Sequence, residues 1–165
     1  MNDCKYGYGI HENVMTLSLL KAATYPNPEA DRGINRFTYS LYPHTNSFAD
    51  GKVVQEAYAL NMPLEASFIE GTDGNMPEVF SLAKTSSDHV ALETIKKAED
   101  DNSVILRLYE FANKKGNAEI ELGFDFKELY LCDLMENNIK KLSHDDNKVQ
   151  IHISNYEIVT LKAIE

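Results

Sequence analysis

Apolar residues in the second half of the chain recur at every second position, in short stretches separated by turn-forming residues. In residues 118–124 the even-numbered positions are apolar, and Glu119 and Glu121 alternate with them. Since successive side chains of a strand point to opposite faces, this pattern predicts a strand with one buried and one hydrated face. Residues 149–153 repeat the pattern and place His152 on the hydrated face.

Three further stretches carry apolar residues on both faces, as strands inside a sandwich do. Asn-, Asp- and Gly-rich segments between the stretches favour turns, because these residues tolerate positive φ or bond their own backbone. Strands at this close spacing predict a β-sandwich for residues 76–165. The three apolar stretches are 104–111, 128–135 and 157–163, and the turn segments are 113–117, 136–138 and 144–147.

The pattern of apolar residues in the first half of the chain predicts only a few regular elements. Residues 13–20 and 36–42 alternate as strands do, and the loop at 24–33 contains two prolines, which disfavour regular structure. Residues 50–60 predict a helix with Asp50 as its N-cap. Two strands and one helix are too few to enclose a core, so we expect this half to belong to a larger assembly.

The composition changes at Glu70–Pro77, which is rich in Gly, Asp and Asn. We therefore predict a partial β-sheet region with one helix at 1–75 and a β-sandwich domain at 76–165. The predicted fold class is mainly β, with antiparallel β-sandwich architecture.

Composition narrows the range of partners. The chain has 165 residues, with 16 Lys and Arg against 26 Asp and Glu, giving a formal charge of −10. This excess of carboxylates argues against binding to nucleic acid, which needs clustered cations. No run reaches the roughly 20 apolar residues of a membrane span, so we expect no membrane partner. Cys4 and Cys132 are far apart in sequence, which favours a reducing compartment over a disulfide scaffold.

Each candidate chemical motif is explained more simply as a structural feature than as a catalytic or metal site. The acidic run Glu99–Asp101 predicts a solvated turn. His144–Asp146 contains an H-x-D triplet, but without a second nearby histidine it favours a hairpin loop over a metal site. Cys132 lies among leucines and predicts a core thiol, and the sequence contains no G-x-S-x-G motif. The residues alone indicate no self-contained active site.

Several segments nevertheless resemble the C-terminal region of α-mannosidases of glycoside hydrolase family 38. In the first half these segments are residues 2–8, 18–21, 24–31 and 37–44; in the second half they are 93–100, 106–110, 132–134 and 157–162.

The resemblance implies a much longer parent chain that hydrolyses terminal α-mannosides with retention of configuration. It also implies an aspartate nucleophile and a zinc ion bound by His and Asp in an N-terminal catalytic domain. We find no counterpart of these elements here, so we nominate no catalytic or metal residue and no cofactor for this chain. The implied partners are the catalytic N-terminal part of the parent and a mannoside or glycan. The implied location is cytoplasmic. The resemblance is also compatible with a homo-oligomer.

One segment is a candidate for contact with substrate. In the wider family the loop that matches residues 2–8 approaches the substrate site, which makes Asn2, Asp3, Lys5 and Tyr6 substrate-adjacent candidates. Relatives of the Golgi and lysosomal type carry arginine where this chain has Cys4, and Lys5 could supply the charge without the planar guanidinium. The alternative is that Asn2 and Asp3 only shape a turn that supports the wall of the site.

Two other function classes remain open at this stage. The chain has nine tyrosines and seven phenylalanines, which in a non-catalytic carbohydrate-binding module would form an exposed sugar platform. A structural or oligomer-forming sandwich would instead present an apolar surface larger than about 400 Å².

Overall fold

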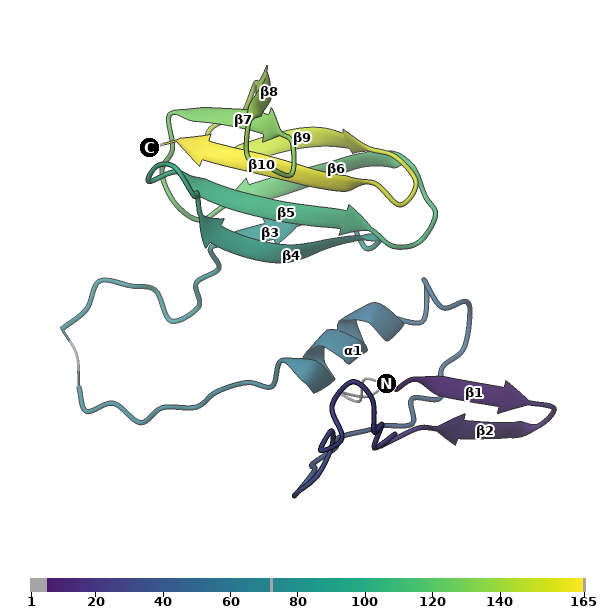
Figure 1. The fold of residues 1–165 in the computed structure, drawn as a ribbon. Coiled ribbons are helices and arrows are strands. Elements are labelled where there is room, and N and C mark those ends of the chain that lie inside the picture. Colours follow the sequence, from purple (N-terminus) through teal and green to yellow (C-terminus); the bar gives the residue numbers. More distant parts are fainter. Residues whose placement is uncertain (1–5, 72, 165) are drawn as a thin grey trace. The chain divides into compact units, whose positions relative to one another are not determined.

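The computed structural model describes residues 6–71 and 73–164. The chain divides into two compact units, Met1–Glu70 and Gly71–Glu165, which are described separately below. Figure 1 shows the second unit as a β-sandwich and the first as a hairpin with one helix and long irregular segments.

The first unit contains an antiparallel hairpin of β1 (Tyr8–His11) and β2 (Val14–Leu17). The hairpin turn places Glu12 at φ +53°, and β2 lies inside the longer strand predicted for residues 13–20. In the register of the hairpin Ile10 lies opposite Met15. Because facing residues share one side of a sheet, one face of the hairpin is apolar.

Residues 36–42 were predicted to form a strand, and this prediction is wrong. The structure assigns them no strand and gives only a single bridge position, at Tyr39. The apolar side chains of the alternating pattern remain open to solvent, with Tyr39 62% and Leu41 78% exposed. Alternation alone does not make a strand, because a strand also needs a neighbour to complete its ladder of hydrogen bonds.

The helix α1 (Val53–Asn61) is present but begins three residues after the predicted N-cap. Lys52 occupies the N-cap position at φ +57° and makes no side-chain capping bond. Asp50 instead accepts a hydrogen bond from the Ser47 hydroxyl (Oγ to Oδ2, 2.6 Å), so its carboxylate closes the preceding turn. The helix ends before Pro63, as predicted.

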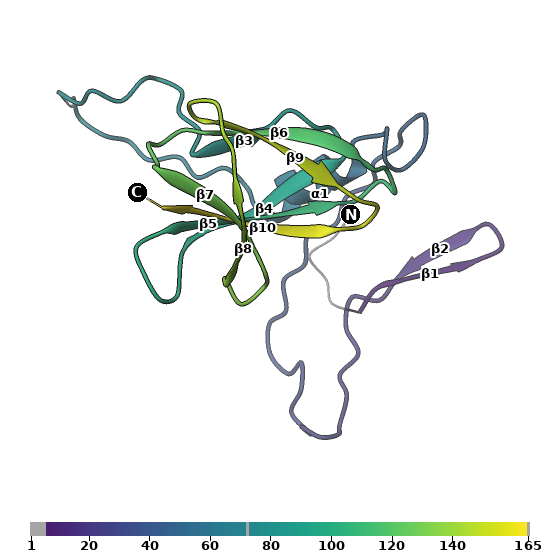
Figure 2. The ribbon, with the colours of Figure 1, turned by 90° about the horizontal axis from the view of Figure 1, so that it is seen from above.

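The second unit has two antiparallel sheets. The five-stranded sheet has the order β4-β5-β10-β7-β8 and the three-stranded sheet has the order β3-β6-β9. Figure 2 shows β6 and β9 as a layer above β5 and β10. The strands are β3 (Ala83–Thr85), β4 (Val90–Lys97), β5 (Val104–Glu110), β6 (Gly116–Leu122), β7 (Glu128–Cys132), β8 (Asn138–Leu142), β9 (Lys148–Ile153) and β10 (Ile158–Ile164).

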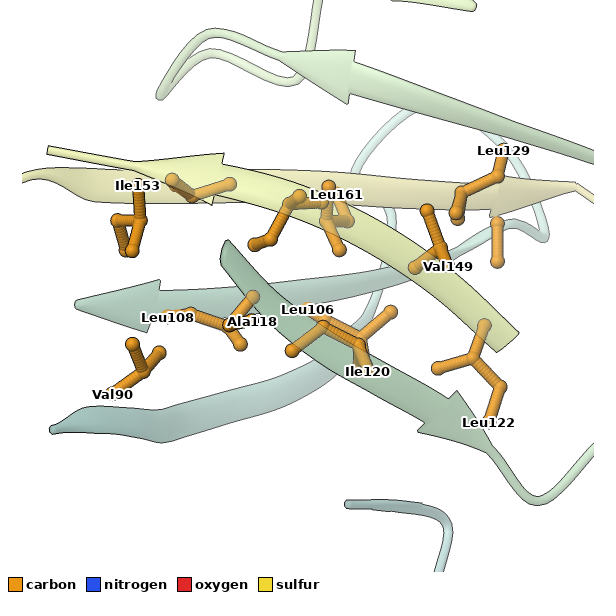
Figure 3. Packing of buried hydrophobic residues seen from close by; sticks show 13 residues of the cluster. Val90, Leu106, Leu108, Ala118, Ile120, Leu122, Leu129, Val149, Ile153 and Leu161 are labelled. Carbon is orange, nitrogen blue, oxygen red and sulfur yellow. The ribbon is translucent and has the colours of Figure 1, made fainter. Parts of the chain in front are cut away.

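The core lies between the two sheets (Figure 3). Leu106 and Leu161 from the larger sheet and Ile120 and Ile153 from the smaller sheet are completely buried. The predicted alternation in β6 and β9 is therefore confirmed, and His152 lies on the exposed face as expected. The mainly β, antiparallel sandwich fold predicted from the sequence is also confirmed.

A buried carboxylate joins two loops at one end of this sandwich. Glu110 is 2% exposed and accepts backbone N–H bonds from Ala112, Asn113, Lys114 and Tyr156, at 2.7 to 3.1 Å. Burial raises the pKa of Glu110, but the four N–H donors together outweigh it and hold the pKa below its ordinary value. This carboxylate is a structural anchor, since its oxygens are occupied by backbone donors.

Candidate functional site

Tyr6 is the one substrate-adjacent candidate within the described residues. Asn2, Asp3 and Lys5 lie outside them, and their predicted role stays a prediction. The Tyr6 hydroxyl donates a hydrogen bond to Asp31 Oδ2 at 2.6 Å, and both residues are half-buried. This bond to Asp31, together with burial and the nearby negative charge, raises the pKa of Tyr6.

Asp31 lies near the end of the loop predicted for residues 24–33. Its Oδ2 atom also accepts the backbone N–H of Ala22 at 3.0 Å, and its own carbonyl accepts a bond from Asn35 Nδ2 at 2.9 Å. The loop is further closed by a bond from the Glu29 N–H to Asn27 Oδ1 at 3.0 Å. The loop is thus ordered by its own polar groups, and Asp31 connects it to Tyr6.

The apolar face of the hairpin lines an open groove with two adjoining hollows of about 290 and 540 Å³. Both hollows are lined by Tyr8 and Met15 of the hairpin and by Ser40 and Leu41 of the segment predicted as a strand. Ile10 joins them in the larger hollow and is 75% exposed. Such exposure of apolar side chains on one surface is typical of an interaction site.

The groove offers few polar groups for chemistry. The polar residues that line the smaller hollow are Thr16 and Ser40, besides the tyrosines, and the larger hollow adds His44. No Asp or Glu is among the described residues that line either hollow. The described lining therefore supplies neither of the two carboxyl groups that glycoside hydrolysis uses.

The H-x-D triplet lies in the loop between β8 and β9, as predicted. Asp145 and Lys148 form an isolated antiparallel bridge, which makes this loop a hairpin. His144 Nδ1 lies 2.8 Å from the carbonyl oxygen of Asp146, and its ring packs on Phe126 with centroids 4.6 Å apart. Within residues 6–71 and 73–164, no group of three or more His, Cys, Asp or Glu side chains is arranged to hold a metal ion.

The acidic run Glu99–Asp101 lies in the turn between β4 and β5, as predicted, but it is not merely solvated. Lys162 Nζ lies 2.8 Å from Asp101 Oδ2, and its hydrogen bond is the main reason why the pKa of Asp101 falls to about 2. The core position predicted for Cys132 is confirmed, since it is buried, and burial raises the pKa of its thiol.

Sequence reasoning missed Glu136, which is 8% exposed and lies at the centre of a charged cluster. Its Oε1 atom is 2.8 Å from Lys96 Nζ and 3.6 Å from Arg107 Nη2, and its Oε2 atom accepts the Glu99 N–H at 2.9 Å. The bond from Lys96 is the largest cause of the lowered pKa of Glu136. Its partners are 29 to 40 residues away in sequence, so no local pattern indicates the cluster.

A comparison with known protein families shows which family the sandwich matches. Residues 89–161, from just before β4 into β10, match the family described as "Glycosyl hydrolases family 38 C-terminal beta sandwich domain". The chain carries this family 38 domain. The resemblance recognised in the sequence is therefore confirmed.

Two longer proteins are similar to this chain across both of its units. The chain is 37% identical over 166 residues to "Alpha-mannosidase 2C1" of Homo sapiens, which covers 98% of this chain and 16% of the relative. It is 34% identical over 171 residues to "Alpha-mannosidase G" of Dictyostelium discoideum, covering 99% of this chain and 16% of the relative. The chain thus spans only about a sixth of these relatives' length.

A third relative has a different name. The chain is 30% identical over 141 residues to "Putative mannosylglycerate hydrolase" of Halalkalibacterium halodurans, covering 84% of this chain and 15% of the relative. All three similarities extend well beyond residues 89–161 and therefore include part of the first unit.

Within the described part of the chain, no helix is long and apolar enough to cross a membrane.

Proposed function

We propose that this chain is the C-terminal β region of an α-mannosidase that hydrolyses terminal α-mannosides with retention of configuration. The observation that carries the proposal is similarity over 98% of the chain to a protein named α-mannosidase, of which the chain matches only 16%. In this proposal the chain completes and braces a catalytic part supplied by the rest of such an enzyme. The isolated chain is expected to be inactive.

The apolar groove supports the bracing role. Ile10, Met15 and Leu41 are each between 67% and 78% exposed and lie along the same groove. Exposed apolar area costs free energy in water, at about 25 cal/mol for each Å². Covering the groove with another part of the enzyme would recover that free energy.

The described residues do not fit the zinc ion that the family resemblance implies. Zinc needs three or four convergent ligands, and none of the described residues form such a set. We therefore assign any such ion, and the two carboxyl groups of a retaining mechanism, to the part of the enzyme that this chain would brace.

A carbohydrate-binding module is the second candidate function. One observation favours it: Tyr8 and Tyr39 line the same hollow and are 58% and 62% exposed. A sugar also needs polar partners for its hydroxyls, and half of the residues that line this hollow have non-aromatic apolar side chains, namely Met15, Leu17, Leu19 and Leu41. The composition of the groove thus favours a protein partner over a sugar.

Activity measurements on two proteins test the proposal. The purified chain should not hydrolyse an aryl α-mannoside, whereas a chimera in which it replaces the matching segment of the Homo sapiens relative should do so. Hydrolysis by the chain alone that a zinc chelator abolishes would contradict the assignment of chemistry to the absent part. A folded chimera without activity would contradict the bracing role.

A pair of substitutions in the chimera tests the groove itself. Ile10→Asp should reduce activity at least about tenfold, because an unpaired carboxylate would be buried when the groove is covered. His11→Asp is the matched control, since the adjacent side chain lies on the opposite face of the same strand. An equal loss of activity in both variants would mean that the substitutions damage the hairpin and would not support a role for the groove.

A further inference from the structure

The loop between β8 and β9 borders a polar hollow of about 430 Å³ on the exposed face of the smaller sheet. Ligand pockets of proteins usually have volumes of about 300–1,000 Å³. The H-x-D triplet supplies two residues of the lining, and the hollow has no part in the proposed bracing role. The hollow is lined by Glu119, Ser143, His144, Asp145, Lys148 and Gln150.

Strands β6 and β9 supply a rigid floor for this hollow. Glu119 and Gln150 lie directly opposite each other in the β6–β9 register, and Gln150 Nε2 donates a hydrogen bond to Glu119 Oε2 at 3.1 Å. Lys148 Nζ donates to the other oxygen, Glu119 Oε1, at 3.3 Å. The bond to Glu119 uses one donor of the Gln150 amide, which retains a second N–H and its carbonyl oxygen for a ligand.

The β8–β9 loop supplies a wall whose conformation is fixed. Asp145 and Lys148 exchange two backbone hydrogen bonds at 2.9 Å. His144 Nδ1 lies 2.8 Å from the Asp146 carbonyl oxygen, which can only accept, so Nδ1 carries a hydrogen and Nε2 stays available to a ligand. The His144 ring also packs on Phe126. A loop held in this way loses little conformational freedom when it binds a ligand.

Two side chains of this wall have hydrogen-bonding capacity that the chain does not use. Within the described residues, the Asp145 carboxylate and the Ser143 hydroxyl have no hydrogen-bond partner. The hollow therefore places acceptors, on Asp145 and on His144 Nε2, beside donors on Gln150 and Lys148.

The charges of the lining favour a neutral ligand. Glu119 and Lys148 neutralise each other at 3.3 Å, which leaves one net negative charge, on Asp145. That charge repels anions such as phosphate. The described residues also form no group of His, Cys, Asp and Glu arranged to hold a metal ion. A neutral ligand whose groups both donate and accept hydrogen bonds fits the lining, and the hydroxyls of a sugar do both.

We propose that this hollow binds one sugar unit of a neutral glycan. The Asp145 carboxylate accepts hydrogen bonds from the sugar hydroxyls, and the Gln150 amide donates to a neighbouring hydroxyl oxygen. All residues of the site come from the sandwich, so binding does not depend on the rest of an enzyme. Only the choice of mannose as the sugar rests on the proposed α-mannosidase function.

NMR titrations of the whole chain with methyl α-mannoside and with methyl α-galactoside test this site. The amide signals of residues 143–150 and of Glu119 should shift saturably with the mannoside, with a Kd of about 1–10 mM for a ligand of this size. Asp145→Ala and Gln150→Ala should each weaken binding at least about fivefold. His152→Ala is the matched control, because it lies two residues beyond Gln150 on the same exposed face and outside the lining; it should change the Kd less than about twofold.

Three outcomes would overturn the sugar site. These are shifts that stay linear with both sugars well above the expected Kd, equal losses of affinity in all three variants, and saturable shifts at these residues with inorganic phosphate instead of a sugar. Saturable binding of the galactoside alone would support the site and contradict only the choice of mannose. None of these readouts depends on catalysis, so an inactive chimera would contradict the proposed function and leave the sugar site standing.

Discussion

At the scale of single residues, the Glu110 carboxylate holds two loops together at one end of the sandwich. Each of its oxygens accepts two backbone N–H groups, and the most distant donor, Tyr156, is 46 residues from Glu110 in sequence. Backbone donors buried without partners cost about 1–3 kcal/mol each. The carboxylate therefore stabilises both loops together.

We expect Glu110→Gln to lower the free energy of unfolding by about 2–3 kcal/mol, because an amide NH₂ would face two N–H donors. Urea denaturation followed by circular dichroism measures this change. Glu119→Gln, in an exposed ion pair with Lys148, should cost less than about 1 kcal/mol and serves as the control.

The effect of Glu110→Gln should also depend on pH. Because the folded pKa of Glu110 lies below its unfolded value, the ionised group stabilises the fold above the unfolded pKa. That contribution is lost as the pH falls through the folded pKa. The difference between the wild type and the variant should therefore be complete at pH 7 and shrink in acid; a difference that grows in acid would contradict this account.

At the scale of elements, the glycines at the two ends of β6 differ in their surroundings: Gly116 is the first residue of the strand and Gly123 follows its last. A Cβ on Gly123 would lie 2.1 Å from the carbonyl oxygen of Ser81, whereas a Cβ on Gly116 would meet nothing within 4 Å. Gly123 also donates its N–H to the Leu82 carbonyl at 2.9 Å, so the two backbones must stay close. Glycine is thus required at one end of the strand and is optional at the other.

We expect Gly123→Ala to reduce stability by about 1–3 kcal/mol, because backbone atoms must move apart to admit the methyl group. Gly116→Ala should be neutral or stabilise the fold by up to about 1 kcal/mol through the entropy of the unfolded chain. Thermal unfolding of both variants measures the contrast. Equal losses of stability would mean that the approach to Ser81 is not the reason for the glycine.

The elements also show which parts of the fold could be predicted from the sequence. Strands that bury alternate residues against the core, such as β6 and β9, were predictable. The strand β4 was missed because a bulge between Leu92 and Thr94 shifts its alternation, and the edge strand β8 was missed because four of its five residues are exposed. Of the candidate site, Tyr6 could be proposed from the family resemblance, but its contact with Asp31 depends on tertiary structure.

At the scale of the whole molecule, the two units differ in how they are stabilised. The second unit has a continuous core of completely buried residues from both sheets, whereas the first has no fully buried residue in its hairpin or helix among those described. Stability in the first unit therefore depends more on what covers it.

A fragment of residues 71–165 should accordingly fold alone. Its amide NMR spectrum should be well dispersed, and it should unfold in a single cooperative transition. A fragment of residues 1–70 should give poorly dispersed amide signals and rapid digestion by protease. Comparable protection of both fragments would contradict the dependence of the first unit on a partner.

The order of strands in the larger sheet also bears on synthesis of the protein. The last strand in sequence, β10, lies in the middle of that sheet and pairs with β5 on one side and β7 on the other. While residue 164 is still inside the ribosome, β5 and β7 lack the neighbour that joins them. Folding of the sandwich must therefore wait until β10 has emerged, and until then the nascent chain exposes its apolar strands to chaperones and to other chains.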